Sequence, residues 1–120
     1  MNRFIEQIAF FFKMNDVKTE KEIGKILTRN SMTISTAESC TGGLISSRLT
    51  DIAGSSAYIK ENYVTYANEV KEKLLNVSDE TLKNHGAVSE QCAKEMSEGL
   101  FKATGSDVAL AITGLAGPGG

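Results

Sequence analysis

A short stretch with two glycines, residues 36–43 (Thr-Ala-Glu-Ser-Cys-Thr-Gly-Gly), carries the side chains best suited to chemistry. Ser39 and Cys40 could each act as a nucleophile, because a neighbouring base can activate a serine and a helix N-terminus lowers the pKa of a thiol. Backbone N–H groups in Thr41-Gly42-Gly43 could bind a phosphate or stabilise an oxyanion. The stretch lacks the P-loop, the dinucleotide fingerprint and the Gly-x-Ser-x-Gly nucleophile elbow, so these residues alone leave the reaction open.

A serine nucleophile needs a base, and the sequence offers two candidates. The single histidine, His85, lies beside Gly86 at an expected helix end, where histidine more often serves as a cap. Lys71 is expected in the first turn of a helix that Asn68 can cap. The helix dipole disfavours a cation there by a few tenths to about 1 kcal/mol, which favours the neutral amine that can activate a serine. From the residues alone a solvated surface lysine is the simpler interpretation, and Cys40 stays open as the alternative nucleophile.

The apolar pattern places polar residues at the ends of expected strands. A short strand over residues 32–35 precedes the reactive stretch, and a helix over residues 44–50 follows it. Residues 57–66 are expected to form a second strand, and the almost wholly apolar run 108–113 is typical of a strand buried on both faces. Three groups follow these strands: residues 38–41, Tyr66 with Lys71, and Thr113-Gly114. Since strand-to-helix junctions that point the same way form a ligand crevice in an open α/β sheet, we expect the three groups to meet.

Helices are expected between the strands. Thr19 with Glu22 fits a capping box for a helix that ends at Asn30, and Ser78 and Ser89 can cap two later helices. Four residues recur on the expected inner face of the last helix: Cys92, Met96, Leu100 and Ala103. The alternation of strands and helices predicts an α/β fold of three or four strands.

Composition bounds the class of protein. A chain of 120 residues is about one domain, and its net charge of −2 gives no support for nucleic-acid binding, which usually needs a basic stripe. Two cysteines and one histidine are too few for a Cys/His zinc site. We expect reduced thiols in a cytoplasmic protein rather than a disulfide.

Residues 1–17 form an apolar extension. The extension is rich in phenylalanine and is expected to be a helix that packs on the domain or on a second subunit. It is too short to span a bilayer and lacks the cleavage site of a signal peptide. Binding to a membrane surface is the alternative for this segment.

Five motifs, in matching order and spacing, resemble the CinA C-terminal domain family. They are residues 36–43, Asp51–Ser56, Val64–Lys71, His85–Glu90 and Thr113–Gly120. The resemblance covers about residues 18–120. It implies a three-layer α/β/α domain with a small mixed sheet, assembled as a homo-oligomer, with a dimer favoured.

The resemblance also implies an activity. Such family members are nicotinamide-nucleotide amidohydrolases, which convert nicotinamide mononucleotide to nicotinic acid mononucleotide and ammonia in pyridine-nucleotide recycling, without a metal or organic cofactor. By resemblance Ser39 is the nucleophile, Lys71 its base and Tyr66 an aid to the proton relay, which replaces the surface interpretation of Lys71. The implied ligand-binding residues are Thr41, Gly42, Gly43, Thr113, Gly114, Gly117 and Gly119. Which loop binds phosphate and which forms the oxyanion hole stays open.

Family domains usually continue for some tens of residues past the glycine-rich loop at 114–120. We therefore expect residues 18–120 to be a domain that is incomplete at its carboxyl end. A non-catalytic nucleotide-binding or subunit-interaction module with an incomplete site is the alternative function.

Overall fold

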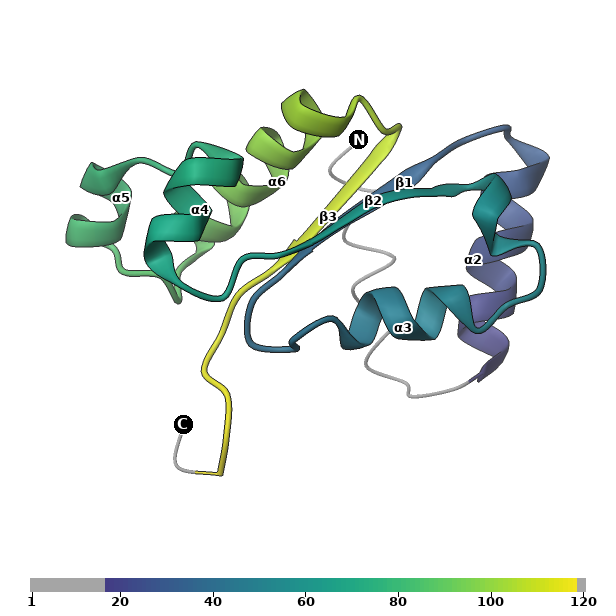
Figure 1. Cartoon of the computed structure of the whole chain (residues 1–120), viewed down its shortest axis with the longest axis horizontal. Coiled ribbons are helices and arrows are strands. Elements are labelled where there is room, and N and C mark those ends of the chain that lie inside the picture. Colours follow the sequence, from purple (N-terminus) through teal and green to yellow (C-terminus); the bar gives the residue numbers. More distant parts are fainter. Residues whose placement is uncertain (1–16, 119–120) are drawn as a thin grey trace.

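A computed structural model describes residues 17–118 of the chain (Figure 1). Its strands are β1 (Ile34–Glu38), β2 (Ile59–Val64) and β3 (Val108–Ile112). Its helices are α2 (Val17–Arg29), α3 (Leu44–Thr50), α4 (Asn68–Leu75), α5 (Asp79–Asn84) and α6 (Glu90–Thr104), with a 3-10 turn η1 (Ser55–Ala57). The expected helix within residues 1–17 lies almost entirely outside the described residues.

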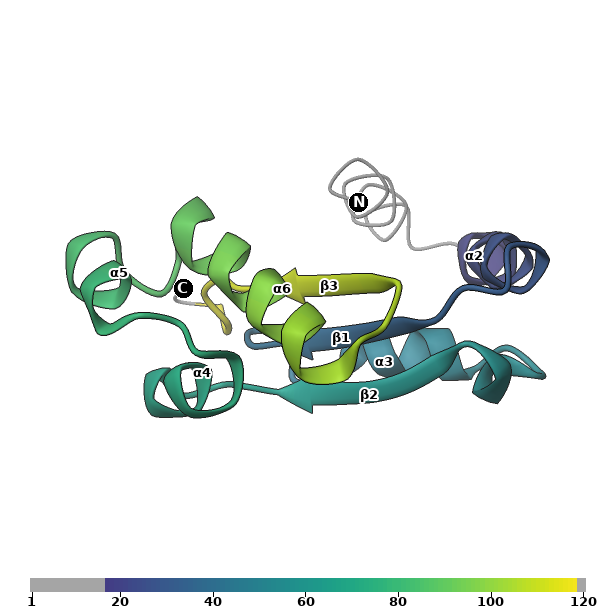
Figure 2. The same cartoon turned by 90° about the horizontal axis from the view of Figure 1, so that it is seen from above.

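The described strands form one sheet in the order β2-β1-β3, and both pairings are parallel. The expectation of a mixed sheet is therefore wrong for residues 17–118. Each strand is joined to the next by a crossover that contains helices, and such connections return the chain in the same direction. All three strand arrows point the same way in Figure 2.

Helices cover both faces of the sheet, which confirms the three-layer α/β/α arrangement. Figure 1 shows α2 and α3 on one side of the strands and α4, α5 and α6 on the other. Two separate clusters of buried apolar residues fill the spaces between the layers. The first contains Ile23, Leu27, Ile34, Ile45, Leu49, Tyr58, Val108 and Leu110, and the second contains Ala37, Leu75, Val77, Cys92, Met96, Leu100 and Ala109.

The central strand differs most from the expected one. It runs through Glu38 instead of ending at Ser35, so Thr36 and Ala37 belong to the strand and not to the turn. Every residue of β1 is buried, because neighbours pair with it on both edges and helices cover both faces. Pairing with other strands overrides the polar character of these residues, which had indicated a loop.

Several local predictions are confirmed and three are corrected. One of the three is the Asn68 cap, because Asn68 is the first residue of α4 and Ala67 is at the N-cap position. Ser78 and Ser89 are the N-caps of α5 and α6, and each side chain accepts a hydrogen bond from the backbone N–H of the third residue of its helix. Thr19 is the third residue of α2 and is buried, so the expected capping box is wrong. On α6 the inner face contains Cys92, Met96 and Leu100, whereas Ala103 is exposed.

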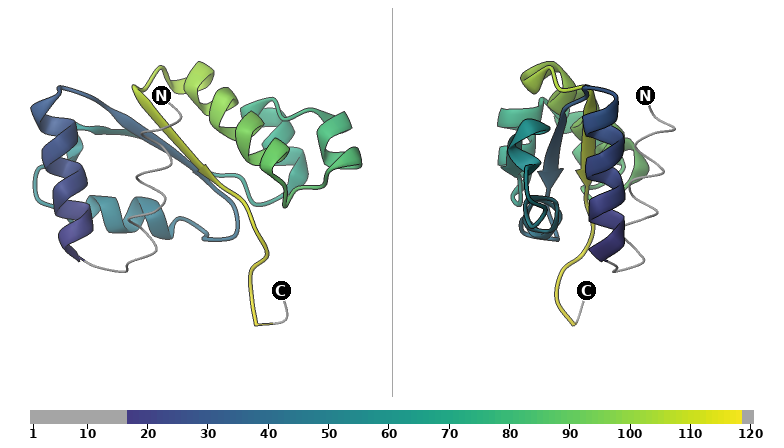
Figure 3. Two further views of the ribbon diagram at one scale, coloured as in Figure 1. Left: turned by 180° about the vertical axis from the view of Figure 1, so that it is seen from behind. Right: turned by 90° about the vertical axis from the view of Figure 1, so that its right-hand side faces the viewer.

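The chain leaves the sheet after β3. Seen from behind in Figure 3, residues 113–118 continue past the carboxyl end of the strands instead of folding back over them. No helix in the described part of the chain is long and apolar enough to cross a membrane.

Candidate active site

Parallel pairing aligns the carboxyl ends of the three strands. Glu38 at the end of β1 pairs with Val64 at the end of β2 and with Ile112 at the end of β3. The residues that follow each strand therefore leave the sheet at the same edge. This is where an open α/β sheet places its ligand crevice.

Lys71 is buried at this edge, directly against Ser39. The lysine is 1% exposed, and its Nζ lies 3.1 Å from Ser39 Oγ. Nζ also donates to the carbonyl oxygens of Thr65 and Tyr66, each at 2.9 Å. The fourth residue of α4 thus points back under the strand ends, and the surface interpretation of this lysine is wrong.

The surroundings of Lys71 favour its neutral form. Burial lowers the pKa of the lysine, and the charges of the Cys92 and Cys40 thiols oppose this shift only in part. Among the described residues its hydrogen-bond partners are a hydroxyl and two carbonyls, and none is a carboxylate. A neutral amine has two N–H groups and one lone pair. The two carbonyls use both N–H groups, which leaves the lone pair facing Ser39 Oγ.

Glu38 is the second buried ionisable group of the site, and the sequence assigned it no role. Its Oε1 accepts hydrogen bonds from Thr41 Oγ1 at 2.7 Å and from the Ile45 backbone N–H at 2.8 Å. Its Oε2 accepts from the Ser46 backbone N–H at 2.9 Å and from Ser46 Oγ at 2.6 Å. Burial raises the pKa of this carboxyl, but the hydrogen bonds outweigh burial and bring the pKa below its ordinary value. The carboxylate therefore stays ionised at the positive end of α3.

The turn between β1 and α3 supplies backbone donors. Gly42 and Gly43 have φ angles of 63° and 107°, a left-handed region that favours glycine. The Gly42 N–H donates to Ser39 O, whereas the N–H groups of Thr41 and Gly43 have no acceptor among residues 17–118. The N–H groups of α3 at Ile45 and Ser46 are used by Glu38. The turn, and not the helix itself, is left to bind an anion.

Tyr66 reaches the site through its main chain. Its carbonyl oxygen holds Lys71, while its side chain is 63% exposed. The described structure contains no hydrogen bond from the Tyr66 phenol to the Ser39–Lys71 pair, so its role in a proton relay stays a prediction.

The segment after β3 meets the site at Gly114. A Cβ atom on Gly114 would lie 3.0 Å from Cys40 Sγ, so a larger residue would push the thiol aside. Thr113 Oγ1 donates to Ala87 O at 2.8 Å and ties the end of β3 to the loop before α6. Gly117 is exposed in the segment that leaves the sheet, and Gly119 lies outside the described residues.

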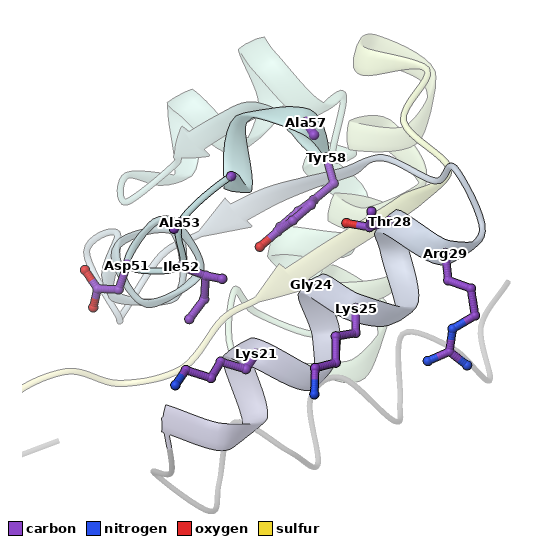
Figure 4. A pocket seen from close by; sticks show the side chains of 11 residues that line it. Lys21, Gly24, Lys25, Thr28, Arg29, Asp51, Ile52, Ala53, Ala57 and Tyr58 are labelled. Carbon is purple, nitrogen blue, oxygen red and sulfur yellow. The ribbon is translucent and has the colours of Figure 1, made fainter.

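The other candidate groups lie elsewhere. His85 is exposed at the end of α5, and among the described contacts none joins its side chain to Ser39. No group of three potential metal ligands occurs within residues 17–118. A pocket of about 780 Å³ between α2 and residues 51–58, around Gly24 and Tyr58, contains none of the predicted site residues (Figure 4).

Comparison with known proteins identifies the family of the chain. Residues 16–120 match the CinA C-terminal domain. The chain belongs to this family. A CinA-like protein of Chloroherpeton thalassium is 53% identical over 112 residues, which cover 93% of the chain and 27% of that relative. The chain thus spans about a quarter of the length of the curated CinA relatives it matches.

Solved structures of the CinA family share the fold. The competence/damage inducible protein of Agrobacterium tumefaciens is 46% identical, with a TM-score of 0.84 over 87% of the chain and 63% of that protein. A CinA superfamily protein of Escherichia coli is 33% identical, with a TM-score of 0.84 over 89% of the chain and 63% of that protein.

Proposed function

We propose that the chain hydrolyses the carboxamide of nicotinamide mononucleotide to nicotinic acid mononucleotide and ammonia. The observation that carries the proposal is the buried Ser39–Lys71 pair, in which a lysine with a lowered pKa lies 3.1 Å from a serine hydroxyl. A base within hydrogen-bond distance is what a serine needs in order to attack a carbonyl carbon. The family resemblance of the reactive stretch supplies the substrate.

The first half of the reaction forms an ester. Neutral Lys71 takes the Ser39 proton as Oγ attacks the carboxamide carbon, and the carbonyl oxygen becomes an oxyanion. Free N–H groups at Thr41 and Gly43 are placed in the turn to stabilise this charge, which typically contributes about 3–4 kcal/mol per donor. Lys71 then returns the proton to the leaving nitrogen, the C–N bond breaks, and ammonia leaves.

The second half regenerates the serine. A water molecule gives a proton to Lys71 and attacks the ester carbon, and the C–O bond to Ser39 breaks as the proton returns to Oγ. We assign Tyr66 to the proton relay as its phenol approaches a bound ligand. The ligand-binding residues that the family resemblance implies are Thr41, Gly42, Gly43, Thr113, Gly114, Gly117 and Gly119.

The proposed setting is a cytoplasmic homodimer that acts in pyridine-nucleotide recycling. The alternative is a non-catalytic module that binds a nucleotide or a second subunit. The chain spans 63% of the length of the solved CinA relative from Agrobacterium tumefaciens, so both functions are tested with and without the family's carboxyl-terminal segment.

Ammonia release separates the two functions. We expect the chain, or a version extended by the family's usual carboxyl-terminal segment, to release ammonia from nicotinamide mononucleotide. Calorimetry in the same samples measures binding. Binding of the nucleotide without ammonia release by either version would establish the module and contradict the hydrolase.

A further inference from the structure

Glu38 does more than end a strand, because its side chain holds both sides of the turn that carries Ser39. One carboxylate oxygen accepts a hydrogen bond at 2.7 Å from the hydroxyl of Thr41, which lies two residues after the proposed nucleophile. The same carboxylate accepts hydrogen bonds of 2.6–2.9 Å from two backbone N–H groups of α3 and from the Ser46 hydroxyl. The start and the end of the turn are therefore fastened to one fully buried group.

Capping α3 alone would not require a residue from β1. The N-cap position of this helix is Gly43, which makes no side-chain capping hydrogen bond. A serine or aspartate near that position could cap the helix locally, as Ser78 and Ser89 do for α5 and α6. A cap supplied by Glu38 instead joins the helix to the residue that directly precedes Ser39.

The main chain of Glu38 acts on the other partner of the pair. Its carbonyl oxygen accepts the Thr65 N–H at 2.7 Å. Thr65 and Tyr66 are the residues whose carbonyls hold Lys71 Nζ. Glu38 is thus one residue from the nucleophile and one hydrogen bond from the segment that orients the base.

We propose that Glu38 is the positioning residue of this site, whose buried carboxylate fixes the Ser39 turn against the segment that holds Lys71. The inference rests on the proposed function for its role in turnover but has a structural readout of its own. Without the carboxylate the turn loosens, Ser39 Oγ leaves Lys71, and water reaches the amine.

The test compares Glu38→Gln with a matched control, Glu95→Gln. The glutamine keeps the shape of Glu38 but turns one acceptor into a donor that faces the donors of α3. Glu95 also caps a helix, since it accepts the Ser78 N–H at 2.9 Å and the Thr81 hydroxyl. Its loss removes comparable hydrogen bonds away from Ser39.

Two experiments are made on the folded variants. Kinetics of ammonia release give kcat and KM, and NMR titration of lysine labelled at Cε gives the pKa of Lys71. In Glu38→Gln we expect kcat to fall on the order of 10²-fold with KM little changed, as for a misplaced reacting group. The pKa of Lys71 should rise toward its ordinary value because the amine becomes solvated. Cys40 and Cys92 are the titratable groups whose charges act on Lys71, and both stay in place.

Glu95→Gln should lower the melting temperature but leave kcat and the Lys71 pKa as in the unaltered chain. If Glu38→Gln fails to fold, Ser46→Ala removes a single hydroxyl from the carboxylate and should show the same two changes at smaller size. If kcat or the pKa of Lys71 stays at its original value in the folded variant, the inference is overturned. If neither the unaltered chain nor its extended version releases ammonia, the proposed function fails, and the Lys71 titration alone decides the role of Glu38.

Discussion

Lys71 is the proposed base, and its burial has consequences for the proposed activity. Its pKa is lowered chiefly by desolvation, so the neutral amine forms at a lower pH than in a solvated lysine, whose ordinary pKa is 10.5. Only the neutral amine can accept the Ser39 proton. The same burial makes the charged form costly within the fold.

We predict that kcat/KM rises with pH through the lowered pKa of Lys71 and then levels off below pH 10.5. The rise follows the fraction of free enzyme that carries a neutral lysine. Initial rates of ammonia release between neutral and alkaline pH test this prediction. A profile that is flat, or that falls over this range, would show that the base is another group.

Stability should follow pH with the same sign. The pKa of Lys71 is lower in the folded chain than in the unfolded chain, so between the two values the unfolded chain binds more protons. The free energy of unfolding should therefore increase as pH rises from the folded pKa toward 10.5. Urea unfolding of the chain and of Lys71→Met over this range tests the assignment, and we expect the methionine variant to lack this increase. An equal increase in both proteins would mean that Lys71 is not its source.

Cys40 is the other nucleophile next to the base, and geometry separates it from Ser39. Lys71 Nζ is hydrogen-bonded to Ser39 Oγ, whereas the Cys40 thiol lies against Gly114. We predict that Cys40→Ser releases ammonia at close to the original rate. Alkylation of the thiol should slow the reaction only because the added group is bulky. Loss of turnover in the small, polar serine variant would favour the thiol mechanism.

At the scale of elements, α6 and α4 approach each other closely at Gly99, where a side chain would have no room. A Cβ atom on Gly99 of α6 would lie 1.8 Å from Leu75 O at the end of α4. Backbone cannot move aside as a flexible side chain can, so glycine is required for the two helices to approach. This contact sets α4, and with it Lys71, against the rest of its layer.

Gly99→Ala should therefore destabilise the fold by roughly 1–3 kcal/mol, although alanine is the better helix former. Glu98→Ala on the exposed side of α6 is the matched control and should change the free energy of unfolding by no more than about 0.5 kcal/mol. Chemical denaturation of both variants measures the difference. Equal stability of Gly99→Ala and the original chain would show that the helices do not pack this closely.

Local signals in the sequence located the helices better than the strands. Ser78 and Ser89 cap their helices as predicted, because a cap depends on residues close in sequence. The carboxyl half of β1 and the parallel arrangement depend on pairing with residues far along the chain. No local signal in the sequence indicates this pairing. The same holds for Glu38, whose buried position follows from the extension of β1 by the residues 36–38.

The candidate site shows the same division. Residue type and the family resemblance pointed to Ser39 and Lys71, and the structure brings their side chains together. The burial of Lys71 could not be predicted, since α4 must first pack against α6 before its fourth residue points under the strands. Tyr66 was predicted for its phenol, but the described structure uses its carbonyl.

At the scale of the molecule, one parallel sheet between two helical layers gathers the groups at the carboxyl ends of its strands. The proposed nucleophile, Ser39, directly follows the central strand, the proposed base, Lys71, lies in α4 after β2, and Gly114 after β3 lies against Cys40. The match to the Agrobacterium tumefaciens structure covers 87% of this chain and 63% of that protein. The Ser39–Lys71 pair, on which the proposed chemistry depends, lies wholly within the described residues.

The most direct test of that pair is ammonia release from nicotinamide mononucleotide by the Ser39→Ala variant. The original chain and Cys40→Ser are measured beside it. If the short chain is inactive, all three proteins carry the family's carboxyl-terminal extension. Removal of the hydroxyl leaves the hydrogen bonds of Lys71 to Thr65 and Tyr66 intact, so the variant should fold. We predict that its kcat falls at least on the order of 10³-fold, as for the loss of a nucleophile, while Cys40→Ser stays active. Near-normal ammonia release by folded Ser39→Ala would contradict the assignment of Ser39 as the nucleophile.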